Sequence, residues 1–564
     1  MLVLFQGHAS RSYALKGGLL SSGEMQPLWW QSGVVYQIYP RSFRDSNGDG
    51  VGDLAGAIAK LDYVSETLGV DAVWLSPFFP SPMADFGYDV SNYCDVDPLF
   101  GDLETFDRLV AEAHARDLRV IIDYVPNHTS DQHPWFTESR SSRDNPKRDW
   151  YVWRDPQPDG SLPNNWQASF GGPAWTLDET TGQYYLHSFL PQQPDLNWRN
   201  EDVKEAMFGV VRFWMERGVD GFRIDVAHRI MKDPELRDNP PTPDAGKLRH
   251  KDQGEYDSQL HIHDMGHEDV HDVYREMRSV LEEYSEDQPR IAIGEIHIFE
   301  LDVWSSYYGA ALDELHLPFN FGLLAVPWDA TGVQQFVDAL ESTIPEGAWP
   351  NYVVGNHDEP RVASRIGLER ARIAMMLLLT LRGTPTLYQG DELGMQDVPV
   401  PPEKVQDPWG IRVGDLSLGR DPQRAPMLWD NGPNAGFTAP GVEPWLPIAA
   451  DYQTRNVASQ LDDPRSMLAL TRRLLAERSA SPALSLGDYV PVEANSDACM
   501  VWIRQRGDER YLVTLNFTDQ PQTLNLPLSG RGQMVASTQM DRDGAEDLTS
   551  FKLRGNEGCL LKLL

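Results

Sequence analysis

Short apolar segments alternate with longer amphipathic segments along most of the chain. The longer segments include residues 54–68, 103–116, 201–217 and 270–284, whose apolar positions recur at helical spacing. The short segments have the length and composition of buried strands and lie at residues 34–38, 72–75, 120–124, 221–224, 291–294, 315–317, 352–354 and 386–388. Repeated strand–helix units build parallel sheets, and eight of them predict an α/β fold, the (β/α)8 or TIM barrel.

Two connections are far longer than the few residues that usually join a strand to a helix. Residues 128–200 are rich in Trp, Pro, Gly and Asp, and residues 393–463 carry many Pro and Trp. Long connections inside a compact domain usually carry function. We therefore expect an inserted domain B at 128–200, after the third strand, and a long loop or subdomain at 393–463, after the eighth.

The pattern changes after a helix expected at residues 464–478. Short β-like runs separated by Gly, Pro and Asp follow at residues 489–492, 500–504, 511–516, 522–526 and 559–563. Such spacing is typical of antiparallel sheets. We expect a C-terminal antiparallel β-sandwich (domain C) at 485–564, and a catalytic barrel (domain A) formed by residues 25–127 and 201–484.

The first residues, MLVLFQG, lack the basic start and the long apolar centre of a signal peptide. LVLFQG resembles the remnant of a protease-recognition site left by an expression vector. We therefore expect residues 1–24 to be a tail and the natural start to lie near Met25.

Charge and composition narrow the classes of partner. The 564 residues include 49 basic and 84 acidic side chains, for a net charge of −35, which disfavours nucleic acid and anionic membrane surfaces. A neutral substrate is not hindered, and 17 Trp and 20 Tyr provide flat faces of the kind on which sugar rings pack. No apolar run is long enough to span a bilayer. The expected partner is a small molecule, bound by a monomer or homodimer.

Three cysteines, Cys94, Cys499 and Cys559, are spread over the chain. They form neither metal-ligand spacing nor a disulfide framework. This suits the reducing cytosol, so we expect a cytoplasmic protein.

The segment GFRIDVAH, residues 221–228, places two charges in a strand-like run. Residues two apart in a strand point to the same side, so Arg223 and Asp225 face one place. Burying a carboxylate is costly unless it is paired, and Arg223 is a ready partner. By itself the segment is equally consistent with a structural ion pair and with a catalytic site.

Other polar residues follow strand-like runs elsewhere in the chain. In a barrel the C-terminal ends of the strands converge on one pocket. A single such residue is as often a turn or cap as a catalyst, but several on different strands would cost too much stability to be incidental. The residues at these ends are Asp89, Asp123, Asn127, His128, Arg223, Asp225, Glu295, His357 and Asp358.

Paired carboxylates without a catalytic cysteine, nucleotide loop or zinc cluster suggest glycoside hydrolysis. Arg223 should keep Asp225 ionised, which suits a nucleophile. Glu295 follows an apolar strand with no adjacent cation, so a raised pKa and a general-acid role are expected. Asp358 could stabilise a cationic sugar, and His128 and His357 could donate hydrogen bonds to ring hydroxyls.

Four segments in order and spacing resemble the signature regions of the α-amylase superfamily, glycoside hydrolase family 13. They are DYVPNH (123–128), GFRIDVAH (221–228), the Glu295 of IGEIH and NHDEP (356–360). QPDLNW (193–198) resembles a fifth region of the oligo-1,6-glucosidase and α-glucosidase branch, and VVYQIYPRSF, DSNGDGVGDL and GTPTLYQGDELG add to the match. The resemblance runs from about Trp29 to the C-terminus.

The resemblance implies a retaining mechanism with Asp225 as nucleophile, Glu295 as acid/base and Asp358 as transition-state stabiliser. It also implies a subsite for the non-reducing glucose, in which a pair between Asp89 and Arg424 closes the pocket and favours attack on chain ends. Arg424 is taken from DPQRAPMLWD, where the family counterpart reads closer to NARTPMQWD. The residues implied for this subsite are Tyr88, Asp89, His128, Arg223, His357 and Arg424.

The loop DSNGDGVGD offers oxygen ligands at positions 45–53. It differs from an EF-hand because its twelfth position is Gly56 rather than Glu. A turn that merely needs Asp, Asn and Gly would look the same, but related enzymes hold Ca²⁺ or Mg²⁺ here. We expect a structural Ca²⁺ or Mg²⁺, and no organic cofactor, with ligands at Asp45, Asn47, Asp49, the Val51 carbonyl and Asp53.

Linkage specificity depends on the residue after the nucleophile, Val226, which shapes the acceptor side. In this branch Val tends to accompany α-1,6 activity, yet AHRIMKDP resembles bacterial α-glucosidases more closely. We expect an α-glucosidase acting on maltose-type oligosaccharides or sucrose, with transfer of glucose to other acceptors. The alternatives are an oligo-1,6-glucosidase acting on isomaltose, an isomerase of the trehalose-synthase type, and a non-catalytic sugar-binding member.

Overall fold

The computed structural model describes residues 27–242, 254–286 and 288–564, so the tail expected at 1–24 lies outside the described residues. Eight parallel strands form one sheet in the order β10-β11-β1-β2-β3-β7-β8-β9. A parallel bridge between Asn320 and Tyr352 joins the two ends of this order and closes the barrel. The strands are β1 (Val35–Ile38), β2 (Ala72–Leu75), β3 (Arg119–Tyr124), β7 (Gly221–Ile224), β8 (Ile291–Glu295), β9 (Leu317–Phe319), β10 (Asn351–Val353) and β11 (Thr384–Tyr388). The predicted (β/α)8 barrel is confirmed.

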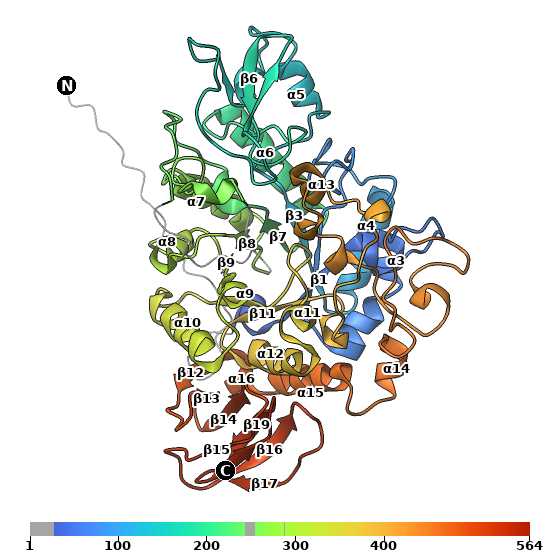
Figure 1. Cartoon of the computed structure of the whole chain (residues 1–564), viewed down its shortest axis with the longest axis vertical. Coiled ribbons are helices and arrows are strands. Elements are labelled where there is room, and N and C mark those ends of the chain that lie inside the picture. The colour runs from blue at the N-terminus through green and yellow to red at the C-terminus, as the bar shows by residue number, and fades with distance from the viewer. Residues whose placement is uncertain (1–26, 243–253, 287) are drawn as a thin grey trace, which may run out of the picture.

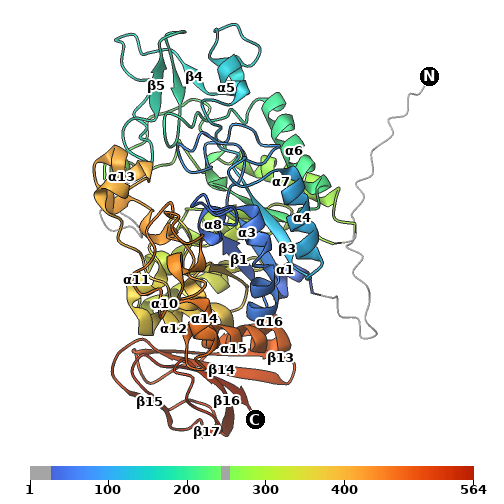
Figure 2. The ribbon, with the colours of Figure 1, turned by 90° about the vertical axis from the view of Figure 1, so that its right-hand side faces the viewer.

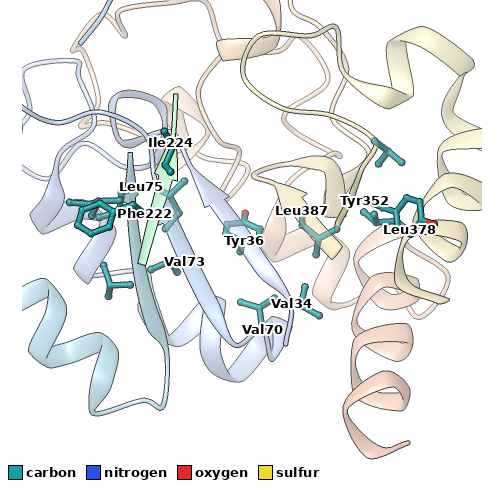
Figure 3. Packing of buried hydrophobic residues seen from close by; sticks show 14 of the residues in the cluster. Val34, Tyr36, Val70, Val73, Leu75, Phe222, Ile224, Tyr352, Leu378 and Leu387 are labelled. Atoms are coloured by element: carbon teal, nitrogen blue, oxygen red, sulfur yellow. The ribbon is translucent and has the colours of Figure 1, made fainter. Parts of the chain in front are cut away.

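Alternate residues of each strand belong to two different cores. Val73 and Leu75 of β2 pack outward with apolar residues of the surrounding helices, and Figure 3 shows part of this outer layer. Ala72 and Trp74 of the same strand belong to a second cluster inside the barrel. Because side chains alternate along a strand, Arg223, between outward Phe222 and Ile224, points into the barrel.

Helices surround the barrel (Figure 1), and those predicted at 103–116, 201–217 and 270–284 begin where the pattern places them. The surrounding helices include α4 (Leu103–His114), α6 (Glu201–Glu216), α7 (Val270–Glu282), α10 (Ala330–Thr343), α12 (Leu368–Thr380), α15 (Met467–Ala480) and α16 (Pro482–Leu486). The single helix expected at 54–68 is wrong, because α3 (Leu54–Ile58) is followed by a separate π-helical turn, η1 (Tyr63–Leu68). The π turn keeps Tyr63 buried, and its hydroxyl donates to Glu392 at 2.8 Å.

The insertion after β3 forms a small unit at the top of Figure 1. It holds α5 (Pro134–Ser139) and a three-stranded antiparallel sheet in the order β4-β6-β5. An antiparallel bridge between His128 and Asp195 brings the two ends of the insertion together, so the barrel strands on either side stay in register. The strands are β4 (Trp153–Arg154), β5 (Trp175–Asp178) and β6 (Gln183–Leu186).

The long connection after β11 contains only short helices, among them α13 (Pro408–Val413) and α14 (Val457–Leu461). It reaches back along the molecule, and α13 lies next to the insertion in both views (Figures 1 and 2). The side chain of Arg412 in α13 donates to the carbonyl of Gly171 in the insertion at 3.0 Å. Two segments far apart in the sequence therefore meet above the barrel.

The C-terminal residues form antiparallel sheets at the opposite end of the molecule (Figure 2). A six-stranded sheet has the order β12-β13-β14-β19-β16-β17, and β15 pairs with β18. The strands are β12 (Asp488–Pro491), β13 (Cys499–Arg506), β14 (Glu509–Asn516), β15 (Gln522–Leu524), β16 (Arg531–Ser537), β17 (Ala545–Asp547), β18 (Phe551–Leu553) and β19 (Gly558–Leu563). The β domain was predicted, but strands β16 to β18 were not, because each is short or interrupted by Gly.

Buried Arg504 fixes this β domain to the barrel, and buried Arg478 ties together the barrel segments beside the junction. Arg504 of β13 donates to the carbonyl of Thr380 at the end of α12 at 2.7 Å and to that of Gly487 at 2.8 Å. Arg478 of α15 donates to the carbonyls of Leu379 and Leu381 at 3.0 and 3.2 Å. Each guanidinium thus satisfies carbonyls that the ends of helices leave open. Among the described helices, none is both long and apolar enough to cross a membrane.

Candidate active site

Strands β7 and β8 are neighbours in the barrel, and their carboxyl ends bring three charged residues together. Asp225 follows β7 directly, and Glu295 is the last residue of β8. Arg223 Nη1 lies 2.8 Å from Asp225 Oδ1, and its Nη2 lies 2.7 Å from Glu295 Oε2. The same guanidinium lies 2.7 Å from Asp123 Oδ1 on β3. One buried cation therefore joins three carboxylates.

The expectation that Glu295 has no adjacent cation is wrong. Glu295 contacts two groups in addition to Arg223. Its Oε1 lies 2.7 Å from His297 Nε2, and its Oε2 accepts a hydrogen bond from the backbone of Val226 at 2.8 Å. The contact between Arg223 and Glu295 could not be recognised in the sequence, because the pattern of one strand does not identify the strand beside it.

The protonation expected for the free enzyme is also reversed. Burial and the negative charge of Glu295 raise the pKa of Asp225 well above its usual range. Burial opposes ionisation of Glu295 too, but Arg223 and His297 lower its pKa below the usual range. Because the two carboxyls are coupled through one guanidinium, their proton belongs to the pair rather than to one residue.

Asp358 lies after β10 and is held from two sides. Arg424 Nη2 lies 2.7 Å from its Oδ1, and His357 Nε2 lies 3.2 Å from its Oδ2. Desolvation opposes ionisation of Asp358, but the contact with His357 and the charge of Arg424 hold its pKa below the usual range. The carboxylate is therefore kept ionised where it faces the pocket.

The expected pair between Asp89 and Arg424 is wrong. The Asp89 carboxylate accepts from Ser81 and from the backbone of Ala84 and Asp85, within one tight turn, while Arg424 donates to Asp358 and to the His357 carbonyl. Burial raises the pKa of Asp89 to about 6. It is a structural residue of the turn.

The pair that closes the pocket is formed by Asp85 and Arg420. Arg420 Nη2 lies 2.6 Å from Asp85 Oδ1 and 2.7 Å from Asp407 Oδ1, and its Nη1 lies 3.3 Å from Asp358 Oδ1. Both residues of the pair stand four positions before the predicted ones, Asp89 and Arg424. The sequence has an Asp at both 85 and 89 and an Arg at both 420 and 424, so only the folded turns show which Asp pairs with which Arg.

A pocket of about 200 Å³ opens above these residues. Of the residues predicted for the site, those lining it are Tyr88, His128, Asp225, Val226, Glu295 and Asp358. Arg223 and His357 lie behind them, and each contacts a lining residue: Arg223 contacts Asp225, and His357 Nε2 lies 2.7 Å from the Tyr88 hydroxyl. Burial lowers the pKa of His128 to about 4, so its ring is neutral at pH 7.

An aromatic wall of the pocket was not predicted. Phe170 of the insertion stacks on Trp409 of α13, with ring centroids 5.2 Å apart and planes at 23°. Arg229 and Tyr256 also line the pocket, and the arginine donates to the tyrosine hydroxyl. The signal for this wall in the sequence was the abundance of Trp in the two long connections.

The loop at 45–53 folds around Asp45. Its carboxylate accepts backbone hydrogen bonds from Asn47, Gly48 and Gly50 at 3.0, 2.7 and 2.9 Å. Asn47 Nδ2 donates to Asp49 Oδ2 at 3.1 Å, whereas the carboxylate of Asp53 caps α3. Within the described residues, no group of three or more His, Cys, Asp or Glu is arranged to hold a metal. The side-chain and carbonyl oxygens of the loop are nevertheless the donors that Ca²⁺ and Mg²⁺ prefer.

Comparisons with known proteins identify the family of the chain. The model of the alpha-amylase catalytic domain matches residues 37–487. The chain is 45% identical over 514 residues to a probable alpha-glucosidase of Rhizobium meliloti, covering 89% of this chain and 91% of that protein. It is 37% identical over 577 residues to an oligo-1,6-glucosidase of Parageobacillus thermoglucosidasius, covering 96% and 100%.

A solved structure extends the agreement to three dimensions. An alpha-glucosyl transfer enzyme superimposes with a TM-score of 0.90 at 42% identity, and the match covers 96% of this chain and all (100%) of that one. The protein therefore belongs to the alpha-amylase superfamily of glycoside hydrolases, in its oligo-1,6-glucosidase and α-glucosidase branch.

Proposed function

We propose that the protein is a retaining α-glucosidase that releases α-glucose from the non-reducing ends of short α-glucosides and transfers part of it to other acceptors. The observation that carries this proposal is that Asp225 and Glu295, which both line the pocket, share the guanidinium of Arg223 behind them. Two carboxyls holding one proton supply both a nucleophile and an acid.

The reaction has two steps. Asp225 attacks the anomeric carbon while Glu295 gives its proton to the glycosidic oxygen, and the bond between that carbon and oxygen breaks. A water or sugar hydroxyl then attacks the covalent intermediate, its proton passes to Glu295, and Asp225 is released. Two inversions retain the α configuration.

Substrate binding must place the shared proton on Glu295 before the first step. Attack requires an ionised Asp225, and Arg223 remains beside that carboxylate to stabilise its charge. The ionised Asp358, fixed by Arg424, stabilises the positive charge that develops on the sugar ring. His128 lines the same pocket as a neutral hydrogen-bonding partner for hydroxyls.

Action at chain ends is supported by the closed side of the pocket. Arg420 and Asp85 are almost fully buried, with side chains 6% and 5% exposed, and Arg420 is further tied to Asp407. A polysaccharide chain cannot continue past this cluster without breaking it. The pocket therefore accepts the terminal glucose of a chain.

We expect a structural Ca²⁺ or Mg²⁺ in the 45–53 loop, held by Asp45, Asn47, Asp49, the Val51 carbonyl and, after rotation from its cap, Asp53. Such an ion would brace the loop against its neighbour, since the carbonyl of Gly50 already accepts from Trp445 at 2.9 Å. We also propose a cytoplasmic location, on the grounds of the three free cysteines, and a monomer or homodimer.

Initial rates on maltose, isomaltose, sucrose and starch, measured side by side, test the proposal. α-Glucose as the first product from maltose, with starch a poor substrate, is expected. Faster hydrolysis of isomaltose would assign the oligo-1,6-glucosidase activity instead, and trehalose formed from maltose would assign the isomerase. Inversion to β-glucose would contradict the mechanism.

A further inference from the structure

The carboxylate of Glu295 is held on both of its oxygens. Oε2 is contacted by Arg223 Nη2 at 2.7 Å and by the backbone nitrogen of Val226 at 2.8 Å. Oε1 lies 2.7 Å from His297 Nε2. Arg223 also contacts Asp225, so replacing it would disturb both carboxyls, whereas the 2.7 Å contact of His297 is with Glu295.

The His297 ring is itself fixed in orientation. It stacks face to face on Phe321, with ring centroids 4.4 Å apart and planes at 3°, and the ring of His228 lies 5.8 Å away on another side. Its side chain is 25% exposed and lines the pocket. A ring held in this way keeps its Nε2 directed at Glu295.

We propose that His297 is a positioning residue that fixes Glu295 and sets the pH above which it stops acting as a general acid. This inference rests on the proposed function. An Nε2–H donates to the ionised carboxylate, and the other tautomer accepts at Nε2 when Glu295 carries the proton. The ring therefore maintains the orientation of the carboxyl in both states of the catalytic cycle.

The direction of the pH effect follows from the charges around Glu295. Besides His297, the charged and titratable groups that face it are Arg223 from β7, Asp225 and His228 from the segment that follows β7, Asp123 from β3, and Asp358 from the segment after β10. Removing the His297 donor leaves these in place and withdraws one bond from the ionised carboxylate. The pH at which Glu295 and Asp225 lose their shared proton should then rise, and the alkaline limb of kcat/KM should move upward by about one pH unit.

Two substitutions separate the two contacts of this ring. His297→Phe keeps a flat ring against Phe321 but removes the donor, and His297→Gln keeps a donor near the place of Nε2 but removes the stack. His271→Phe is a matched control, because His271 contacts Glu314 at the same 2.7 Å with a side chain 24% exposed.

The experiment measures kcat/KM against pH for maltose and for 2,4-dinitrophenyl α-glucoside. The dinitrophenolate departs without protonation, so only maltose needs the acid. For His297→Phe we expect the alkaline limb measured with maltose to shift upward and kcat/KM for maltose to fall about tenfold. The value of kcat/KM for the aryl glucoside should fall by less than about threefold. His297→Gln should keep the wild-type limb, and His271→Phe should leave both profiles unchanged.

Other results would overturn the inference. An unchanged alkaline limb in His297→Phe, equal losses on both substrates, or the same shift in His297→Gln would each exclude control through the hydrogen bond. Thermal unfolding of each variant shows whether it is folded. If His297→Phe is unfolded, the position of the alkaline limb in His297→Gln tests the inference: a wild-type position supports it and a shifted one overturns it. A wild-type protein inactive on both substrates would instead refute the proposed function.

Discussion

Replacing Arg420 by Met tests the cluster that closes the pocket. The guanidinium contacts Asp85, Asp407 and Asp358 at 2.6, 2.7 and 3.3 Å, and its side chain is 6% exposed. Removing one partner of a buried ion pair typically costs about 3–5 kcal/mol, because the remaining charge stays buried. Asp358 keeps Arg424, and Asp85 can take up a proton, so we expect the lower value, about 3 kcal/mol, at pH 7.

The pH dependence of this loss has a definite sign. Burial already raises the pKa of Asp85, and without Arg420 it should rise further. The cost of the substitution arises from ionised Asp85 and Asp407, so it should shrink as the pH falls and these carboxyls become protonated. Loss of a charged contact at the end of the pocket should also lower kcat/KM for maltose about a hundredfold.

Denaturant unfolding at pH 5 and pH 7, with maltose kinetics, measures both effects. Arg412→Met is the control, because this exposed arginine lies in the same connection and donates to a backbone carbonyl, that of Gly171, rather than to buried carboxylates. Its free energy of unfolding should change by less than about 0.5 kcal/mol. An Arg420→Met protein within about 1 kcal/mol of wild type, with unchanged kcat/KM, would refute the reasoning.

Three further predictions follow from the site and its surroundings. Asp225→Asn and Glu295→Gln should each lower kcat for maltose by several orders of magnitude while leaving the circular dichroism spectrum intact, and near-normal turnover in either would contradict the assignment. Burial lowers the pKa of His133 to about 4, so its stabilising contribution is present above the unfolded value near 6.5 and is lost as the pH falls toward 4. His133→Asn, which can still cap α5, should reduce the acid-side slope of the unfolding free energy by up to about 1.4 kcal/mol per pH unit. An unchanged slope would count against this role of His133. Chelation of divalent ions should lower the melting temperature and spare kcat at low temperature, and Asp49→Ala should abolish the effect of the chelator; an unaffected melting temperature would argue against an ion in the 45–53 loop.

The carboxylates proposed as catalytic could be located in the sequence because each follows a short, mostly apolar strand. Asp225 follows β7 directly, Glu295 ends β8, and Asp358 follows β10 after a few residues. A buried parallel strand has an unmistakable pattern, and the place where it ends fixes one edge of the barrel. The barrel and the positions of the carboxylates proposed as nucleophile, acid and stabiliser therefore required little beyond local information.

The rest depends on contacts between segments that the pattern does not connect. Arg420 and Arg424 both lie in irregular chain after β11, and only the folded loop decides which of them reaches Asp85. The charge of Arg223 reaches Glu295 across neighbouring strands, which reversed the expected protonation of the pair. Long connections have no periodicity, so their sequence gives composition but no positions.

The contact of Arg504 with the barrel limits how freely the barrel and the β domain can be exchanged between related enzymes. Arg504 comes from the β domain, whereas the carbonyl of Thr380 that it binds belongs to a barrel helix. A β domain transplanted from a relative without an arginine at this position would leave that carbonyl buried and unsatisfied, at a cost of about 1–3 kcal/mol. Successful chimaeras should therefore inherit strand β13 and the end of α12 from the same parent.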